Sequence, residues 1–586
     1  MKALGSNFRV LTLLLAASLA SCGGGGGSTT PPPGTVPPPA PVAVVEKPSG
    51  RAEAARFLTQ ASFGPTDADI DRLLTVGYGP WIDEQLALPA TSHRTSWQAA
   101  DAAIKALDTS KSAGQAEVLE SFWKQAITGR DQLRQRWVFA LSQIFVISMA
   151  DNVVGDQPRA VAAWLDLLGE KGLGDYRELL EAVSRQPLMG VYLSHLRNQK
   201  ADARSGRVPD ENYAREVMQL FSIGVVTLDE AGRAVGSNGG NATYGPSDIS
   251  GLAKVFTGWS YDCPDFPANN CFSSGTNAGR SDADRWFKPM LGYPQYHSSE
   301  EKKFLGATIA PQVPADPAAS LKVALDTLAA HDNVGPFIGK QLIQRLVTSN
   351  PSEAYVTAVS RAFANNGAGV RGDMAAVLKA ILMHPEARLG SDRAGKLREP
   401  VLRLSALLRA FPHASETGAW KVGNTDNPGT SLGQSPLRAS SVFNFYRPGY
   451  VAPGTRTAQA GLVAPEMQLM HETSASGHIN LLRDAVASGV GSSGPSGKRD
   501  IQGNYSAELA LADKAAELVD RIMPRLITGN APEALKTEIV AAVSSIVIPT
   551  LAANGSNQAA VDNAKRSRVN TALLLTLVSP EFLVQK

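Results

Sequence analysis

The stretches LKVALDTLAA at residues 321–330 and GKQLIQRLV at residues 339–347 decide the fold class of this chain. In both, apolar side chains return at every third or fourth residue, which is the period of an amphipathic helix and not the alternation of a strand. We therefore predict a mainly α fold, a large multi-helix globular body. The same period recurs in seven further stretches: 133–147, 160–168, 176–183, 374–383, 396–410, 507–526 and 568–577.

Four long segments between these stretches have a different composition. They are rich in Gly, Ser, Asn and Pro, the residues that favour turns and irregular loops. We expect long irregular loops there and at most a small β-hairpin, in the first of them. A division of the body into two lobes near residues 300–330 stays open. The four segments are 229–247, 262–300, 412–437 and 486–504.

Residues 1–21 are typical of an export signal. Lys2 and Arg9 precede an apolar run from Val10 to Ala20, which is about half as long as a bilayer-spanning helix. Cys22 then follows directly after Leu-Ala-Ser, and this sequence resembles the bacterial lipoprotein box. The resemblance implies cleavage before Cys22 and acylation of its thiol, so we expect an exported lipoprotein held to a membrane through this residue.

Residues 22–49 are predicted to form a tether between the lipid and the body at residues 50–586. Five consecutive glycines at 23–27 are followed by two runs of three prolines, and neither composition buries a core. Gly23, standing where some lipoproteins have Asp, favours the outer membrane by the same resemblance. We expect the protein at the periplasmic side of that membrane or at the cell surface.

Cysteine content and charge narrow the function further. Cys263 and Cys271 lie in one loop, and in an oxidising compartment we expect them to form a disulfide. With no histidine nearby they do not make a zinc site, so we predict no metal ligands, and the sequence identifies no cofactor. Lys and Arg number 56 against 54 Asp and Glu, a balance that argues against nucleic acid as a partner.

Four stretches together resemble a bacterial family of exported proteins catalogued as domain of unknown function 1800. They are ARFLTQASFGP at 55–65, PDENYAREVMQLFSIG at 209–224, FTGW at 256–259 and VSPEFLVQ at 578–585. Their order and spacing match over nearly the whole chain after the tether, which implies a shared architecture but no particular reaction. Many members carry a Trp-His-x-His-Phe run where this chain has LSQIF at 141–145, so no role of those histidines transfers.

The segment from Glu211 to Gly224 is the first candidate site. As a helix capped by Asp210 it would place Glu211, Asn212, Arg215 and Glu216 on its polar side. A carboxylate beside an arginine stays ionised and can act as a base, so Glu211 and Glu216 are the catalytic candidates. Asn212 and Arg215 would bind substrate. The alternative is a solvated helix face or a buried structural Glu–Arg network. Five residues of separation also prevent both carboxylates from flanking one bond.

Three further residues complete the candidate site. His297, in a loop, is the third catalytic candidate, while His195 and Trp259 are candidates for substrate binding. Each has a structural alternative: a surface position for His297, a buried hydrogen bond for His195, and a small aromatic core beneath the disulfide loop for Trp259. The enzymatic interpretation requires the polar side of the segment from Asp210 to Gly224 and His297 to border one solvent-filled pocket.

Two functions fit these observations, and the sequence leaves open whether the protein is an enzyme. One is a carboxylate-using hydrolase that acts on an extracellular or envelope polymer such as polysaccharide. The other is a non-catalytic helical scaffold or binding component of the cell envelope, with a polysaccharide or another exported protein as its partner. An open cleft at the candidate residues favours the first, and a sealed interior favours the second.

Overall fold

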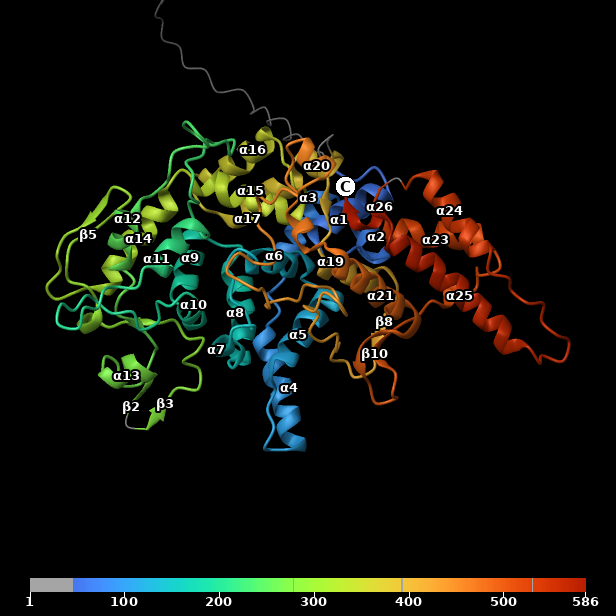
Figure 1. Cartoon of the computed structure of the whole chain (residues 1–586), viewed down its shortest axis with the longest axis horizontal. Coiled ribbons are helices and arrows are strands. Elements are labelled where there is room, and N and C mark those ends of the chain that lie inside the picture. Colours follow the sequence, from blue (N-terminus) through green and yellow to red (C-terminus); the bar gives the residue numbers. More distant parts are fainter. Residues whose placement is uncertain (1–45, 278, 391–393, 530) are drawn as a thin grey trace, which may run out of the picture. The chain divides into compact units, whose positions relative to one another are not determined.

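The computed structural model describes residues 46–277, 279–390, 394–529 and 531–586, which belong to one compact unit (Figure 1). About 51% of the structure is helical, in 26 helices, and the sheets are small and antiparallel. The predicted mainly α fold is confirmed. Within the described ranges, no helix has the length and apolar character needed to cross a bilayer. Cys22, the predicted lipid attachment point, lies outside the described residues.

The helices of the N-terminal half include the candidate segment and the elements around it. They are α1 (Arg51–Ala61), α2 (Asp67–Val76), α3 (Tyr78–Ala87), α4 (His93–Leu107), α5 (Gln115–Thr128), α6 (Gln132–Ser142), α7 (Asn152–Gly155), α8 (Pro158–Lys171), α9 (Tyr176–Ser184), α10 (Pro187–Tyr192), α11 (Asn212–Gln219), α12 (Pro246–Ala253), α13 (Asn269–Ser274) and the 3-10 turn η1 (Pro294–Tyr296).

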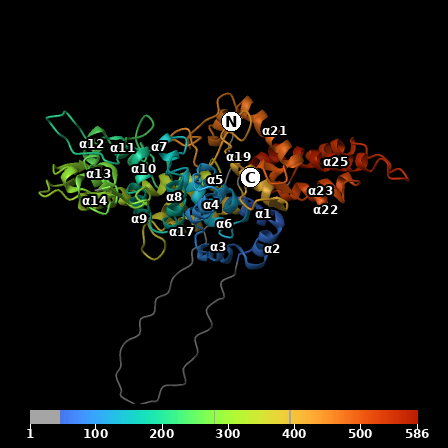
Figure 2. The same cartoon turned by 90° about the horizontal axis from the view of Figure 1, so that it is seen from below.

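The helices of the C-terminal half follow without a long strand between them. They are α14 (Pro317–Ala330), α15 (Val334–Leu346), α16 (Glu353–Ala364), α17 (Met374–Met383), α18 (Pro385–Leu389), α19 (Pro400–Ala410), α20 (Arg456–Gln459), the 3-10 turn η2 (Pro465–Leu469), α21 (Glu472–Ser488), α22 (Ser506–Leu509), α23 (Ala515–Leu526), α24 (Glu533–Ser544), α25 (Gln558–Leu577) and α26 (Pro580–Leu583). Helices α23 and α25 pack against each other in both views (Figures 1 and 2).

The strands are two to five residues long and pair antiparallel. β1 pairs with β4, β2 with β3, β5 with β6, β7 with β11, and β10 lies between β8 and β9. The loop at 229–247 contributes only isolated bridges to Val226 and Leu228, so the expected hairpin is a looser turn. The strands are β1 (Trp259–Ser260), β2 (Thr276–Asn277), β3 (Arg280–Ser281), β4 (Leu291–Gly292), β5 (Lys302–Phe304), β6 (Ala307–Ile309), β7 (Lys396–Leu397), β8 (His413–Ser415), β9 (Val490–Ser493), β10 (Arg499–Gly503) and β11 (Val584–Gln585).

Side-chain caps fix where the helices that matter most for the site begin. The Asp175 carboxylate accepts a hydrogen bond from the Glu178 backbone N–H at 2.9 Å, which starts α9. The Asp316 carboxylate does the same for Ala319 at 3.0 Å, with Pro317 as the first residue of α14. Short polar side chains satisfy backbone N–H groups that a helix leaves free, and proline suits the first helical position. These caps hold α9 and α14 in register where they line a cleft.

One predicted helix is divided by a proline. The stretch 396–410 was expected to be helical throughout, but Lys396–Leu397 form strand β7 and the helix starts only at Pro400. Glu399, the residue before this proline, has φ −59° and ψ 144°, because the proline ring disfavours a helical conformation there. This extended segment places the charged residues Lys396, Arg398 and Glu399 before α19 and not along it.

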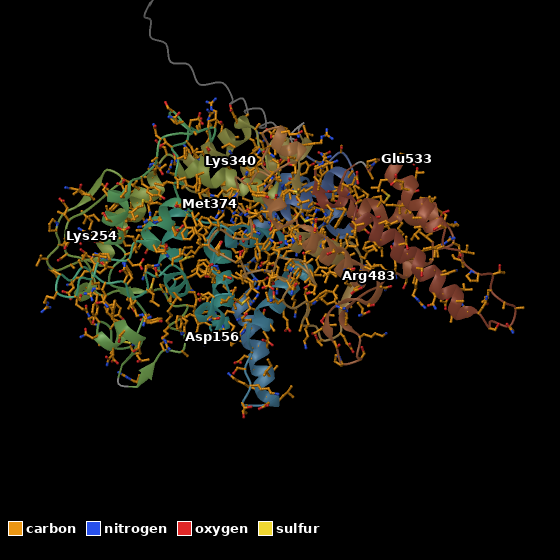
Figure 3. All side chains as sticks on the ribbon, in the orientation of Figure 1. Asp156, Lys254, Lys340, Met374, Arg483 and Glu533 are labelled. Atoms are coloured by element: carbon orange, nitrogen blue, oxygen red, sulfur yellow. A yellow bond between two sulfur atoms is a disulfide. The ribbon has the colours of Figure 1, made fainter. Side chains whose placement is uncertain are left out.

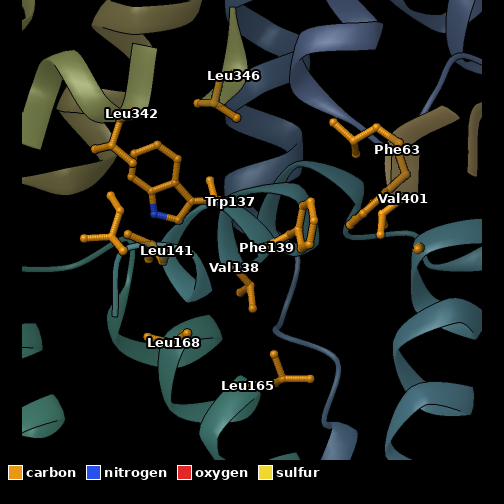
Figure 4. Close-up of a cluster of buried hydrophobic side chains, with 14 of the residues drawn as sticks. Phe63, Trp137, Val138, Phe139, Leu141, Leu165, Leu168, Leu342, Leu346 and Val401 are labelled. Carbon is orange, nitrogen blue, oxygen red and sulfur yellow. The ribbon is translucent and has the colours of Figure 1, made fainter. Parts of the chain in front are cut away.

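The core is continuous through the body and rich in large side chains (Figure 3). Around α6, Trp137 lies beside Leu342 and near Leu346 from α15, and Leu168 from α8 belongs to the same buried cluster (Figure 4). The Trp137 indole N–H donates to the Gly172 carbonyl at 2.7 Å, so its one polar atom is satisfied. Burial of such side chains supplies most of the stabilising free energy of a helical body.

Candidate functional site

The predicted disulfide is present. Cys263 and Cys271 are bonded to each other, with their Cα atoms 5.5 Å apart and both side chains buried. They pack with Phe272 and Tyr293 into a small cluster of their own. The bond therefore closes the loop that follows β1, next to Trp259.

The candidate helix is shorter than predicted. Helix α11 spans Asn212–Gln219, and the Asp210 carboxylate accepts the Asn212 backbone N–H at 2.8 Å just before it. The following turn ends at Gly224, whose φ of +69° is the left-handed conformation that glycine favours. The helix therefore has Glu211 and not Asp210 at its N-cap and Leu220 at its C-cap, four residues before Gly224, so the predicted bounds of the helix are wrong.

The polar face of α11 is open to solvent. The Glu211 and Arg215 side chains are 46% and 45% exposed, and their charged atoms are 3.5 Å apart. Asn212 is exposed as well. These residues therefore lie on a solvated helix face, and the alternative of a buried Glu–Arg network is wrong for them. An exposed ion pair of this kind contributes little to stability.

Glu216 is different from its neighbours because its side chain is buried. Its Oε2 atom has no hydrogen-bond partner among the described residues. Burial raises the pKa of Glu216, and Arg215 opposes this shift. Glu216 is therefore the one carboxyl group of this helix suited to hold a proton.

His297 does not border a solvent-filled pocket, so that expectation is wrong. Its side chain is fully buried, with Nδ1 2.7 Å from the Thr257 carbonyl and Nε2 3.0 Å from Ser320 Oγ. Burial lowers the pKa of His297 to about 4, which keeps the ring neutral. Through these two ring nitrogens, His297 links α14 to the segment that follows α12.

His195 also belongs to the interior. Its ring stacks on Tyr213 of α11 with the centroids 3.8 Å apart, and Nε2 lies 2.8 Å from the Ser184 carbonyl. The Tyr213 hydroxyl donates to Ser184 Oγ at 2.7 Å. These contacts fasten α11 to the end of α9, which is the structural alternative considered for His195.

A large cleft lies between α9 and α14. Its volume is about 1020 Å³. Trp259 lines it, but the residue is only 4% exposed and its indole N–H donates to the Val255 carbonyl, so little of the ring is open to a ligand. Pro289, Leu291 and Leu321 add apolar surface. Of the residues predicted for the site, Trp259 is the one that this cleft includes.

Charged side chains on the two helices line the rest of the cleft. Arg177 donates to Asp326 on α14 at 2.8 Å and to Glu181 one turn along α9. Arg185 reaches the same Glu181 carboxylate at 3.2 Å, and Lys322 reaches Asp326 at 2.5 Å. Burial alone would raise the pKa of Glu181, yet the hydrogen bonds from both arginines lower it, so this carboxylate stays ionised.

A second hollow of about 240 Å³ continues from the cleft. The two share Asp175, Arg177 and Asp326, so the Arg177–Asp326 ion pair forms a common wall between them. Phe363 and Arg371 line the far side of the smaller hollow. The two hollows therefore adjoin each other, with this ion pair between them.

The sequence alone indicates some of the ion pairs that line the cleft. Arg177, Glu181 and Arg185 are spaced four apart, as are Lys322 and Asp326, and such spacing predicts ion pairs along one helix face. Nothing in the spacing shows that α9 and α14 face each other, since 149 residues separate Arg177 from Asp326. In the described part of the chain, no group of three or more His, Cys, Asp or Glu side chains is arranged to hold a metal ion.

Replacing His297 by Gln should reduce the acid sensitivity of the fold. A histidine whose folded pKa is about 4 and whose unfolded pKa is near 6.5 destabilises the protein as the pH falls between these values. Each pH unit in that window costs about 1.4 kcal/mol per histidine. Urea unfolding at pH 7, 6 and 5 measures how steeply the free energy of unfolding falls as the pH is lowered. This dependence should be weaker by about that amount in His297→Gln. An unchanged dependence on pH would mean that His297 is not held neutral.

Comparisons with known proteins agree with the resemblance found in the sequence. The family model described as "Protein of unknown function (DUF1800)" matches residues 56–584, nearly the whole chain. No curated protein matches. No solved structure matches either.

Proposed function

Because the chain belongs to the DUF1800 family of proteins of unknown function, we propose its role from the geometry of the site alone. The protein is an exported lipoprotein of the cell envelope, anchored through Cys22, whose cleft between α9 and α14 binds a neutral polysaccharide without cleaving it. The supporting observation is the pair of adjoining hollows that share Arg177 and Asp326, which offers neighbouring places to successive units of a polymer.

The chemistry of the cleft favours a neutral polymer. Four cationic and four acidic side chains line the larger hollow, so no net charge attracts a polyanion or a polycation. The arginine and carboxylate side chains of the cleft hold one another in place. They therefore offer donors and acceptors of fixed geometry, which can bind the hydroxyl groups of a sugar. Leu291, Leu321 and the small exposed part of Trp259 add apolar surface for the faces of sugar rings.

The state of the carboxylates favours binding over hydrolysis. Glycoside hydrolysis by two carboxyl groups needs one of them protonated as a general acid. Arginine hydrogen bonds lower the pKa of Glu181, and Lys322 and Arg177 lower that of Asp326 against the opposing effect of burial. Both groups therefore act as hydrogen-bond acceptors in this proposal.

The cleft can be filled by one substitution with a close control. Ala318 lines the cleft near the start of α14, while its neighbour Ala319 is exposed on the same helix and outside the lining. We expect Ala318→Trp to weaken binding to envelope polysaccharide at least tenfold, about 1.4 kcal/mol, because the indole occupies the space of the ligand. Ala319→Trp should bind as the unmodified protein does.

Binding is measured with purified protein on immobilised neutral polysaccharides, with melting temperatures as a check on folding. Equal affinity of both tryptophan variants and the unmodified protein would place the ligand elsewhere. If the protein binds a charged polymer and no neutral polysaccharide, the proposed class of ligand is wrong. The cleft is then still the binding site only if Ala318→Trp weakens binding of the charged polymer.

Hydrolysis is the second candidate, and one observation favours it. Glu216 is buried, one of its oxygens has no partner among the described residues, and burial raises its pKa, as a general acid requires. If the protein is a hydrolase, Glu216→Gln should abolish release of reducing ends from polysaccharide while the protein stays folded. Glu211→Gln, on the exposed face of the same helix, is the matched control. If both variants release reducing ends as the unmodified protein does, hydrolysis by Glu216 is ruled out.

A further inference from the structure

The smaller hollow beside the cleft has a chemistry of its own. Its volume of about 240 Å³ is below the range of roughly 300–1,000 Å³ that is usual for pockets that hold a whole small ligand. It adjoins the cleft at the Arg177–Asp326 ion pair, which lines both. A polymer that lies in the cleft can therefore place one substituent of a sugar unit in the smaller hollow.

A fixed hydrogen-bond donor lines this hollow. The Nε atom of Arg371 donates to the Ala329 carbonyl at 3.0 Å, and its Nη2 atom donates to the His331 carbonyl at 2.9 Å. The guanidinium also lies over the Phe363 ring, 5.1 Å from the centroid. These three contacts fix the guanidinium and leave Nη1 without an acceptor among the described residues. Because the group keeps its charge, Nη1 is a strong donor to an oxygen of a ligand.

An acceptor lines the same hollow. One oxygen of Asp326 accepts from Arg177 at 2.8 Å and the other accepts from Lys322 at 2.5 Å. Burial would raise the pKa of Asp326, but the hydrogen bonds from Lys322 and Arg177 lower it, so the carboxylate stays ionised. An ionised carboxylate has about four acceptor positions, so Asp326 can accept from a ligand as well.

The hollow also has a small apolar wall and no net charge. Ala329 and Ala330 line it at the end of α14, and Ala330 is exposed. Two arginines and two aspartates share the lining, so their charges balance. A charged substituent gains nothing from this balance. The group that fits is neutral and combines an acceptor, a donor and a methyl group.

We propose that the smaller hollow binds the N-acetyl group of an amino sugar, so that the polymer in the cleft contains N-acetylated sugar units. The carbonyl oxygen of the acetamido group accepts from Arg371 Nη1, its N–H donates to the Asp326 carboxylate, and its methyl group packs against Ala329 and Ala330. A hydroxyl in the same place on the sugar has no methyl group and is too short to meet both polar partners. The proposal rests on the proposed function, because it needs a polysaccharide in the cleft.

The test compares two sugars that differ at one substituent. Oligosaccharides of chitin and of cellulose have the same linkage, and the acetamido group of the first stands where the second has a hydroxyl. Titration calorimetry of the purified protein with chains of equal length measures both affinities. We expect the chitin oligosaccharide to bind at least about tenfold more tightly, since a hydrogen bond to a charged group is among the stronger ones.

Two variants assign this preference to the hollow. Ala330→Leu fills part of it and should lower the affinity for the chitin oligosaccharide to that for the cellulose oligosaccharide. Its control is Ala319→Leu, at an exposed position of the same helix that lines neither hollow. Arg371→Met removes the donor and should have the same effect as Ala330→Leu. Its control is Arg361→Met, because Arg361 is exposed and pairs with Glu230 at 2.8 Å.

The outcomes separate this proposal from the proposed function. Equal affinity for the two sugars, with both weakened by Ala318→Trp, overturns the N-acetyl site and leaves the cleft as a polysaccharide site. Binding of neither sugar contradicts both.

A preference for the chitin oligosaccharide that survives Ala330→Leu with an unchanged melting temperature also overturns the site, whether or not Arg371→Met folds. Tighter binding of an N-acetylated alanine peptide than of the chitin oligosaccharide assigns the hollow to a peptide and rejects the sugar.

Discussion

Replacing Glu399 by Gln lowers the free energy of unfolding by about 3–5 kcal/mol, the cost of leaving buried charges without their partner. Glu399 is fully buried and accepts from two amides while lying 3.8 Å from Lys396. The substitution preserves the shape of the side chain and removes the negative charge beside the buried Lys396 ammonium. Urea unfolding at pH 7 measures the change.

Glu211→Gln provides the contrast for this measurement. Its partner Arg215 is 3.5 Å away on an exposed helix face, and such pairs contribute less than about 1 kcal/mol. A loss of under 1 kcal/mol in Glu399→Gln, similar to that of Glu211→Gln, would show that the buried network tolerates the change. In that case the Glu399 carboxylate would not be compensating the charge of buried Lys396.

Replacing Cys22 by Ser should move the protein from the membrane fraction to the soluble fraction almost entirely. Each buried CH₂ of an acyl chain contributes about 0.8 kcal/mol, and two or more chains hold a protein stably. The thiol of Cys22 is the predicted attachment point, and serine does not replace it. Fractionation of cells and partitioning into detergent measure the distribution.

The control for this experiment removes the other two cysteines. Cys263→Ser with Cys271→Ser breaks the disulfide that closes the loop after β1 but leaves the anchor sequence intact. This double variant should stay in the membrane fraction. A Cys22→Ser protein that still sediments with membranes would contradict lipid anchoring and point to attachment through the body.

Local patterns in the sequence predict much of the fold. The stretches 321–330 and 374–383 are helical in the structure, because their apolar period of three to four residues is decided by near neighbours. The stretch 396–410 shows where such patterns fail: Pro400 forces its predecessor into an extended conformation, and β7 pairs with β11 from the end of the chain. That pairing depends on contacts distant in sequence.

The site is harder to predict for the same reason. The residues of the segment from Asp210 to Gly224 share one helix, and their exposure follows from which neighbours cover them, not from their spacing. Glu211 and Arg215 lie in solvent, while His297 is sealed between Thr257 and Ser320. The cleft depends on Arg177 meeting Asp326 across two helices, a contact that no local pattern encodes.

Hydrogen–deuterium exchange with and without a bound neutral polysaccharide locates the ligand most directly. We predict slower exchange on binding in α9, in α14 and in the backbone around Trp259 and Leu291, with α11 unchanged, because the cleft lies between those elements. Protection confined to α11, or no protection at the cleft at a saturating concentration of polysaccharide, would contradict the cleft as the binding site.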